Sequence, residues 1–376
     1  MIVAIVCITL LYTILIASLT IGFSKVPIFS SEELNLETKF SIIIPFRNEE
    51  KYLPNLLSSF SKIKYPTSYF ELIFIDDAST DASVEIINRF FETSDKAIPF
   101  SIIENKPISN SPKKDAITLG ISKAKHPWIL TTDADGEVKP KWLQVYDSFI
   151  QKHNPIAIAA PVKGEKANNF LQIFQQLDIL SLQATTIGFF GLKQPLLCNG
   201  ANFAYSKEAF IEVEGFKDNN KIASGDDIFL LEKFAKKYQE KIAYLKSHEA
   251  TVTTRLEKNC RAIIEQRVRW ASKTTKQQSA LVKLTGLVVV AINFLLVVLG
   301  VTSFFEFCYF YFLASVFLLK LMLDYMLLSK TKEIYTSKIS TIHFLVSSII
   351  YPILSLLVFT KSLLGNYQWK NRKFKK

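Results

Sequence analysis

Cysteine and histidine are too few and too dispersed in this sequence to build a disulfide framework or a metal cluster. The four cysteines, Cys7, Cys198, Cys260 and Cys308, are isolated from one another, and none has the spacing of zinc ligands. The four histidines are equally scattered. We therefore expect the soluble part of the chain to fold in a reducing compartment.

Glycine is also scarce, with 12 in 376 residues, and no Gly-rich phosphate-binding loop of the Rossmann or Walker type is present. The stretch after the first expected strand is Pro45-Phe-Arg-Asn, which argues against a nucleotidylyltransferase. If the protein binds phosphate, a metal ion then has to balance the charge. We find no internal repeat and no low-complexity segment.

The hydrophobic content is 49% and the mean hydropathy is +0.20, which excludes a disordered or fibrous chain and fits about two domains with membrane segments. Positive charge is concentrated at the C-terminal end. Residues 271–376 hold thirteen basic and three acidic side chains, a balance of +10 out of the total of +11. A nucleic-acid-binding body would carry its basic patch on the folded domain, so no nucleic-acid partner is expected. The distribution suits Lys and Arg flanking membrane spans.

Four apolar runs are long enough to cross a bilayer: Ile2 to Phe23, Leu284 to Val301, Phe304 to Leu328 and Ile339 to Leu364. The first lacks a basic start and is followed by Lys25, which favours a retained anchor over a cleaved signal peptide and places the next residues in the cytoplasm. Lys320 and Asp324 inside the third run are spaced to pair on one helix face. Pro352 leaves open whether the fourth run crosses once or is re-entrant.

Between Lys39 and Lys246 the pattern alternates between strands and helices. Apolar β-branched runs, expected as buried strands, are followed by helical stretches, which predicts an α/β fold with a mainly parallel sheet. The expected strands are 40–45, 71–75, 100–103 and 128–131, and the expected helices are 51–62, 82–91, 112–125 and 228–237.

Polar side chains follow three of these strands, and ligands of open α/β sheets bind beyond the carboxyl ends of the strands. The loops are 45–50, 76–81 and the turn Asp133-Ala-Asp-Gly136. Simpler roles exist for two of them. Asp and Gly favour turns, and Ser79 or Thr80 could cap the next helix.

Two more motifs lie further along. Asp226 and Asp227 precede an expected helix, where the helix dipole favours carboxylates but where one could also act as a general base. In a basic helical stretch, Gln266, Arg269 and Trp270 share one face while Arg267 turns away. An amphipathic interfacial helix explains this stretch equally well.

In their order and spacing these motifs resemble family 2 glycosyltransferases of GT-A fold, in particular the membrane-embedded branch with the Gln-x-x-Arg-Trp motif. That branch includes cellulose, hyaluronan and poly-N-acetylglucosamine synthases and ceramide glucosyltransferase. The resemblance covers about 40–276 and rests on 41–50, 75–81, 113–120, 132–135, 199–205, 225–227 and 266–270. The flanking spans agree with it.

The resemblance implies roles for the residues of these motifs. Pro45, Arg47 and Glu49 would line the nucleoside pocket, and Asp77 would accept a hydrogen bond from uracil. Lys113 and Asp133 would contact the donor.

It also implies a metal and a base. Asp133 and Asp135 would hold Mg²⁺ or Mn²⁺ against the diphosphate. Asp227 would be the catalytic base, although Asp226 stands where the family has Glu, which leaves open which of the two acts. Gln266, Arg269 and Trp270 would lie by the diphosphate and the acceptor.

The expected protein has an N-terminal anchor over 1–24, a GT-A domain with an interfacial helix over 37–280, and two or three C-terminal spans with a basic tail over 281–376. It would be an inverting, metal-dependent glycosyltransferase of the plasma (inner) membrane, with its catalytic domain in the cytoplasm. The donor would be a nucleotide sugar, with UDP as the expected nucleotide, and the acceptor a membrane-associated lipid or saccharide. A processive polysaccharide synthase and a catalytically inactive scaffold of the same fold are the alternatives.

Overall fold

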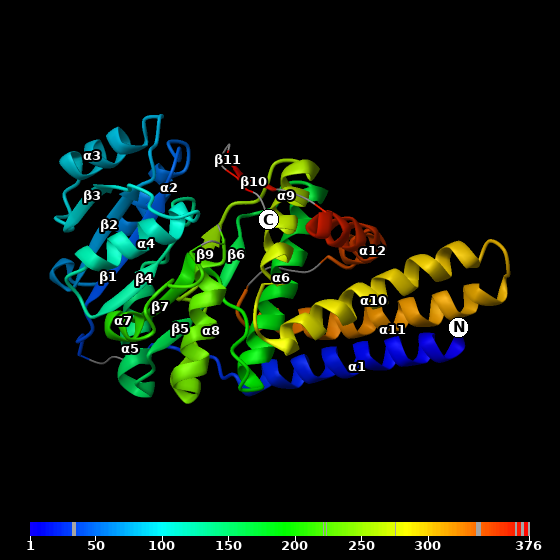
Figure 1. Ribbon diagram of the computed structural model, residues 1–376. Helices are drawn as coiled ribbons and strands as arrows, with labels where there is room; N and C mark the ends of the chain where they lie inside the picture. The colour runs from blue at the N-terminus through cyan, green and yellow to red at the C-terminus, as the bar shows by residue number, and fades with distance from the viewer. Residues whose placement is uncertain are drawn as a thin grey trace. The chain divides into compact units, whose positions relative to one another are not determined.

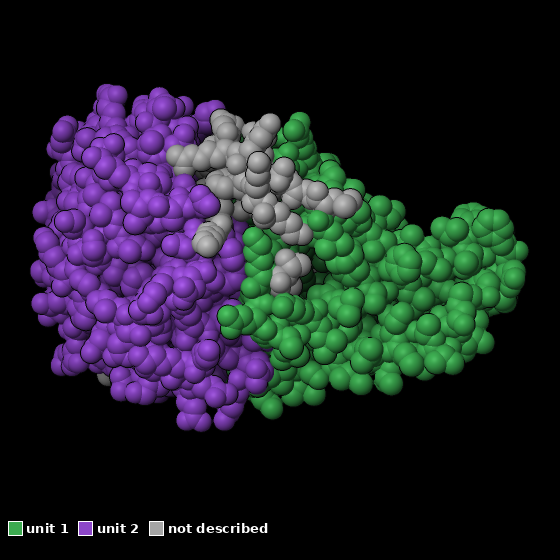
Figure 2. Space-filling model, in the orientation of Figure 1, with its two compact units in different colours: residues 1–25, 166–192, 256–376 green, residues 26–165, 193–255 purple. Residues whose placement is uncertain are grey.

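The computed structural model describes residues 1–31, 35–220, 222, 224–274, 276–335, 340–364, 367–369 and 372–374. The chain forms two compact units, coloured separately in Figure 2. One unit contains 26–165 and 193–255. The other contains 1–25, 166–192 and 256–376, so the chain leaves the first unit at 166 and returns to it at 193. We call them the α/β unit and the helical unit.

The α/β unit is built on a seven-stranded sheet with the order β3-β2-β1-β4-β7-β5-β8 (Figure 1). Its strands are β1 (Phe40–Phe46), β2 (Phe70–Asp76), β3 (Phe100–Glu104), β4 (Trp128–Thr131), β5 (Ala157–Ala159), β7 (Phe203–Ser206) and β8 (Ile242–Tyr244). All neighbours are parallel except β7, which runs antiparallel to β4 and β5. The prediction of a mainly parallel α/β sheet is confirmed.

Helices cover both faces of this sheet because the strand side chains alternate between them. Phe40, Ile42 and Ile44 of β1 belong to the core that also contains α2 (Leu53–Ser61), α3 (Ser83–Thr93) and α5 (Trp142–His153). On the opposite face, Ile43 lies against α4 (Pro112–Lys123) at Gly120, where an added Cβ would be 2.8 Å from the Ile43 side chain.

Two further helices belong to this second face. The rings of Phe203 and Tyr205 on β7 contact Phe234 of α8 (Asp226–Tyr238), and Tyr205 stacks on Phe210 of α7 (Lys207–Glu212).

The strand order fixes where a ligand can bind. From β1 the chain moves outward to β2 and β3 and then crosses back to add β4 on the other side of β1. The strand order therefore reverses between β1 and β4, and ligands of open α/β sheets bind beyond the carboxyl ends of the strands at such a point. A short parallel pair, β6 (Val162–Gly164) and β9 (Val252–Thr254), adjoins this edge through a bridge between Glu137 and Thr253.

The helical unit contains α1 (Ile2–Lys25), α6 (Phe170–Gly191), α9 (Cys260–Thr274), α10 (Ala280–Thr302), α11 (Cys308–Lys330) and α12 (Thr341–Leu364), followed by the antiparallel pair Tyr367–Trp369 and Arg372–Phe374. Four helical segments among the described residues are long and apolar enough to cross a membrane: Ile2–Lys25, Ala280–Thr302, Cys308–Glu333 and Thr341–Leu363. They match the four predicted runs. The helix α12 continues through Pro352.

Small residues allow α1 and α6 to pack closely. A Cβ on Gly22 of α1 would be 2.1 Å from the carbonyl oxygen of Gly188, and a Cβ on Gly191 would be 1.8 Å from the carbonyl oxygen of Gly22. Such contact between backbones is possible only with glycine.

A polar cluster joins α1 and α11 within the helical unit. Lys320 Nζ lies 2.5 Å from Asp324 Oδ2, as the i, i+4 spacing predicts, and the Tyr12 hydroxyl donates to Asp324. The ammonium group is also 5.6 Å from the rings of Tyr12 and Tyr351. Pairing with opposite charge is how ionisable side chains are tolerated at membrane depth.

Candidate active site

The loops after β1 and β2 are tied together by hydrogen bonds. The Arg47 guanidinium donates to the carbonyl oxygens of Asp77 and Ala78, and the Asp77 N–H donates to the Phe46 carbonyl. Asn48 and Ala78 both have positive φ, 53° and 58°. Left-handed backbone at two non-glycine residues is strained and is typical of binding loops held by their surroundings.

Asp77 is 6% exposed and its carboxylate is held by a neighbour. The Asn105 side-chain amide donates to Asp77 Oδ1 at 2.9 Å and to the Pro112 carbonyl at 3.1 Å. Asn105 therefore links the end of β2 to the start of α4. Pro45 and Glu49 lie in the same edge, with the Glu49 N–H donating to Ser83 Oγ at 2.8 Å.

The expected cap of α3 is wrong. This helix has Ala82 at its N-cap without a side-chain hydrogen bond, because the loop side chains bind elsewhere. Ser79 Oγ accepts from the Asn48 N–H at 3.1 Å, and the Thr80 N–H donates to Asn48 Oδ1 at 2.8 Å. Both residues thus connect the first two loops to each other.

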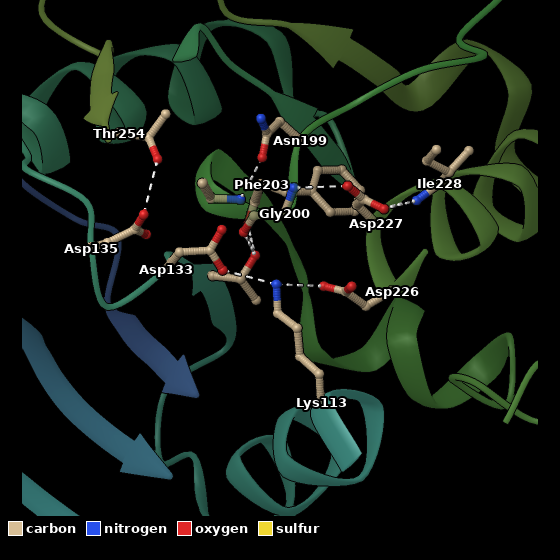
Figure 3. A network of polar contacts seen from close by, with 12 residues as sticks. Lys113, Asp133, Asp135, Asn199, Gly200, Phe203, Asp226, Asp227, Ile228 and Thr254 are labelled. Atoms are coloured by element: carbon tan, nitrogen blue, oxygen red, sulfur yellow. Dashed lines mark hydrogen bonds and ion pairs between the residues drawn. The ribbon is translucent and has the colours of Figure 1, made fainter. Parts of the chain in front are cut away.

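Asp133 and Asp135 sit on a tight turn that directly follows β4. The Gly136 N–H donates to the Asp133 carbonyl at 3.0 Å, so the motif is indeed a turn. In Figure 3 the Asp133 carboxylate points toward Lys113 and the Asp135 carboxylate points toward Thr254, whose Oγ1 lies 3.4 Å from Asp135 Oδ2. Forming a turn and presenting two carboxylates are compatible functions of one sequence.

Lys113 connects the two ends of the site. Its ammonium group lies 2.8 Å from Asp133 Oδ1 and 3.3 Å from Asp226 Oδ2 (Figure 3). Burial disfavours the charged form, but the carboxylates of Asp133 and Asp226 outweigh it, so the pKa of Lys113 is raised above its usual value. Lys113 therefore carries a positive charge between two acidic motifs that are 93 residues apart in the sequence.

The two neighbouring aspartates begin α8 and have different partners. Asp226 is 8% exposed and pairs with Lys113. Asp227 accepts from the Gly200 N–H at 3.2 Å and from the Ile228 N–H at 2.8 Å. Gly200 has to be small here, because a Cβ would lie 2.9 Å from Asp226 Oδ2.

The residues present fit a divalent ion only together with a ligand. Among the described residues no group of three or more His, Cys, Asp or Glu side chains could hold a metal. Mg²⁺ and Mn²⁺ sites in phosphate-binding proteins, however, often use one or two carboxylates and complete their shell with phosphate oxygens and water. Asp133 and Asp135, on the turn after β4, are the carboxylates that could supply such a pair of oxygen donors.

Gln266, Arg269 and Trp270 lie on α9 and belong to the helical unit. The expectation that Arg267 turns away from Trp270 is wrong, because the two residues are themselves one turn apart. The Arg267 guanidinium lies 4.2 Å from the centre of the Trp270 ring. Gln266 Nε2 donates to Glu257 Oε1 at 3.1 Å.

Several supporting residues were not anticipated from the sequence. Lys114 is 1% exposed, and its ammonium donates to the carbonyls of Asn219 at 2.7 Å and Ile222 at 2.9 Å, just before Asp226. Asn202, which is fully buried, accepts from Trp142 and Tyr146 and donates to two backbone carbonyls. The only sequence feature that pointed to Lys114 is that it lies next to Lys113 at the start of an expected helix.

A sheet of this order, with acidic loops gathered at its switch point and no glycine-rich loop, defines an α/β protein of the GT-A class. Residues 41–214 match the model of the family described as glycosyl transferase family 2, and the chain contains a domain of this family. The sheet from Ser41 through β7 and the acidic motifs at 77 and 133–135 fall inside the matched range, while β8, Asp226, Asp227 and α9 lie beyond it.

Curated relatives match part of this chain. The chain is 28% identical over 126 residues to poly(ribitol-phosphate) beta-N-acetylglucosaminyltransferase TarS of Staphylococcus aureus, covering 34% of this chain and 21% of that protein. It is 36% identical over 104 residues to undecaprenyl-phosphate 4-deoxy-4-formamido-L-arabinose transferase of Photorhabdus laumondii, covering 27% and 31%. The chain thus spans less than a third of the length of either relative.

One solved structure resembles nearly the whole chain. It is the mannosyltransferase PcManGT from Pyrobaculum calidifontis in complex with GDP-Man and Mn²⁺, with a TM-score of 0.55, 13% identity and 96% coverage of both chains. At this identity the likeness concerns the fold alone.

Proposed function

We propose that this protein is an inverting glycosyltransferase that moves a sugar from a nucleoside diphosphate donor, UDP in the first instance, to a membrane-associated lipid. The observation that carries the proposal is the gathering of Asp77, Asp133 and Asp227 at one edge of the sheet in a chain with a glycosyl transferase family 2 domain.

The nucleoside end of the donor is assigned to the loops after β1 and β2. Asp77 is buried and oriented by Asn105, and its carboxylate is the kind of acceptor that the ring N–H of uracil needs. Pro45, Arg47 and Glu49 form the other wall. The Arg47 guanidinium donates hydrogen bonds to the carbonyl oxygens of residues 77 and 78, so its role is to hold the shape of this pocket.

The diphosphate end is assigned to the turn after β4. Asp133 and Asp135 would hold Mg²⁺ or Mn²⁺, which when bound neutralises charge on the leaving diphosphate. The Lys113 ammonium lies 2.8 Å from Asp133 Oδ1. Its raised pKa keeps it positively charged, so it can also contact the negatively charged diphosphate.

Asp227 is assigned as the general base. Its carboxylate takes the proton of an acceptor hydroxyl while that oxygen attacks the anomeric carbon. The bond from this carbon to the donor's phosphate oxygen breaks on the opposite side, and the nucleoside diphosphate leaves. A single displacement converts an α-linked donor into a β-glycoside. Asp226 is the weaker candidate because its side chain is nearly buried, whereas Asp227 is partly exposed.

The acceptor is assigned to the membrane. Four helical segments long and apolar enough to span a bilayer frame the catalytic domain in the sequence, and Gln266, Arg269 and Trp270 lie directly before one of them. Relatives named for undecaprenyl phosphate and for poly(ribitol phosphate) support lipid and saccharide acceptors as a class.

The test is a transfer assay on purified protein with radiolabelled UDP-N-acetylglucosamine, UDP-glucose and GDP-mannose. Each donor is offered with dioleoylglycerol, undecaprenyl phosphate or poly(ribitol phosphate), and products are separated into lipid, polymer and free sugar. Label in a lipid product supports the proposal, and a β-linkage by NMR supports inversion. Long polymer would identify a processive synthase, and no product with any pair would favour an inactive scaffold.

A further inference from the structure

The helix α6 holds the segment that carries Gln266 and Trp270. Gln175 of α6 accepts from the Glu257 N–H at 2.8 Å and donates to the Glu257 carbonyl at 2.9 Å. Asp178, one turn further on the same face of α6, forms an ion pair with Arg267 of α9. Two neighbouring side chains of α6 therefore contact both the segment that precedes α9, at Glu257, and the middle of α9, at Arg267.

The ion pair with Asp178 directs Arg267 onto Trp270. The side chains of Arg267 and Asp178 are only 9% and 7% exposed. The guanidinium that Asp178 holds lies 4.2 Å from the centre of the Trp270 ring, within the range of a cation–π contact. The carboxylate orients the guanidinium, and the guanidinium in turn limits the positions that the ring can adopt.

Gln266 is connected to α6 in a similar way, through Glu257. Gln266 Nε2 donates to Glu257 Oε1, and the backbone of Glu257 is held on both sides by Gln175. Trp270 and Gln266 are thus each connected to a side chain of α6 through one intervening residue. All of these residues belong to the helical unit.

Stability alone does not account for a buried charge pair. Replacing such a pair by apolar side chains of similar volume is often neutral or stabilising, whereas removing one partner leaves an uncompensated buried charge. An apolar pair, however, would not place a guanidinium against the Trp270 ring. This difference separates a positioning role from a packing role.

We propose that Asp178 and Gln175 are positioning residues that act through Arg267 and Glu257 to hold Trp270 and Gln266 for the acceptor. The proposal deepens the function proposed above and rests on it. A well-placed cation–π contact predicts that freeing the ring raises the KM for the acceptor by about tenfold. The affinity for the donor nucleotide should not change.

The decisive variant is the double substitution Asp178→Leu with Arg267→Met, which removes the charges but keeps the volume. We expect it to unfold within a few degrees of the wild type, to bind UDP within about twofold, and to show a KM for dioleoylglycerol raised about tenfold. The matched control is Arg261→Met, because Arg261 is an exposed arginine of the same helix whose ion pair with Glu265 runs along that helix. A double variant with an unchanged acceptor KM would overturn the proposal.

A second experiment asks whether Asp178 acts through Trp270. Asp178→Asn is introduced into the wild type and into the Trp270→Ala variant. If Asp178 acts through the ring, it should raise the acceptor KM only where the ring is present, since residues of one unit are not additive. Equal effects in both backgrounds would contradict the proposal. If Trp270→Ala itself leaves transfer normal, the acceptor role proposed for α9 is what fails.

A readout without an acceptor covers the case in which dioleoylglycerol is not glycosylated. The emission of Trp270 is obtained as the difference between each protein and its Trp270→Phe counterpart, and acrylamide quenching is compared between the wild type and Asp178→Asn. We expect stronger quenching of Trp270 in the variant, because a less restrained ring meets the quencher more often. Identical quenching would overturn the proposal whatever the acceptor is.

Discussion

Asp226 and Asp227 are adjacent in sequence but differ in what surrounds them. Both begin α8, where the helix dipole favours a carboxylate. Asp226 is nearly buried and pairs with Lys113, whereas Asp227 is partly exposed and accepts from the backbone N–H groups of Gly200 and Ile228. A general base needs a carboxylate that a substrate hydroxyl can reach, which is why the second aspartate is the better candidate.

We therefore expect Asp227→Asn to lower kcat by at least about 10²-fold, the usual contribution of a general base, while the Kd for UDP stays the same. The amide keeps the shape of the side chain but cannot take a proton. Transfer and UDP binding are measured on one preparation. Normal turnover in this variant, together with an inactive Asp226→Asn, would move the base to the neighbouring residue.

Asp135 allows the metal assignment to be tested by binding. For the wild type we expect Mn²⁺ to tighten the binding of UDP in calorimetry and EDTA to abolish this gain, since the diphosphate completes the shell of the ion. Asp135→Ala should bind UDP equally with and without Mn²⁺. Asp95→Ala, at an exposed acid outside the site, is the control and should behave as the wild type. Tight UDP binding in EDTA by the wild type would rule the metal out.

Lys114 is expected to matter through the loop that precedes the two aspartates. Its ammonium holds the carbonyls of Asn219 and Ile222 and lies 4.9 Å from the ring of Phe229 on α8. Lys114→Met should leave these carbonyls without a buried donor and lower kcat about tenfold, because hydrogen bonds to a charged group are worth about 1.5–3 kcal/mol. Lys114→Arg should recover part of the loss. If both variants show wild-type kcat, the loop does not depend on this lysine.

At the scale of elements, the sequence pattern was sufficient for the central strands and helices. Runs such as Phe40-Ser-Ile-Ile-Ile are apolar on both faces, and the observed β1 to β4 lie within two residues of the predicted strands at each end. The antiparallel β7 was missed because a four-residue strand between two helices carries no local mark of its direction. Pairs such as Asp178 with Arg267, 89 residues apart, exist only once the chain has folded, so no local pattern could reveal them.

The contact between α4 and β1 gives a test at this scale. Gly120 lies so close to the sheet that an added Cβ would be 2.8 Å from the fully buried Ile43 side chain. Gly120→Val should lower the free energy of unfolding by about 1–3 kcal/mol, the usual cost of overpacking a core. Combining it with Ile43→Val should recover part of this loss. Chemical denaturation measures both, and an unchanged midpoint for Gly120→Val would mean that α4 can move away freely.

At the scale of the whole molecule, the distribution of charge predicts how the chain enters the membrane. Lys25 ends α1, Lys276 and Lys283 flank the start of α10, Lys330 ends α11 and Lys332 follows it. Between α10 and α11 the turn at 303–307 has no basic residue and includes Phe304, which is 90% exposed, and Phe305. Basic loops stay in the cytoplasm, so this apolar turn is predicted to face the opposite side.

This orientation can be measured by labelling single cysteines. In a background without Cys7, Cys198, Cys260 and Cys308, we expect Ser303→Cys to react with a membrane-impermeant maleimide in intact cells. Lys332→Cys, at the other end of α11, should react only after the membrane is permeabilised, because the basic loops remain inside. The nucleotide sugar would then be drawn from the cytoplasm, where the Cys198 thiol of the α/β unit stays reduced. The reverse pattern of labelling would place the catalytic domain outside and contradict both the topology and a cytoplasmic donor.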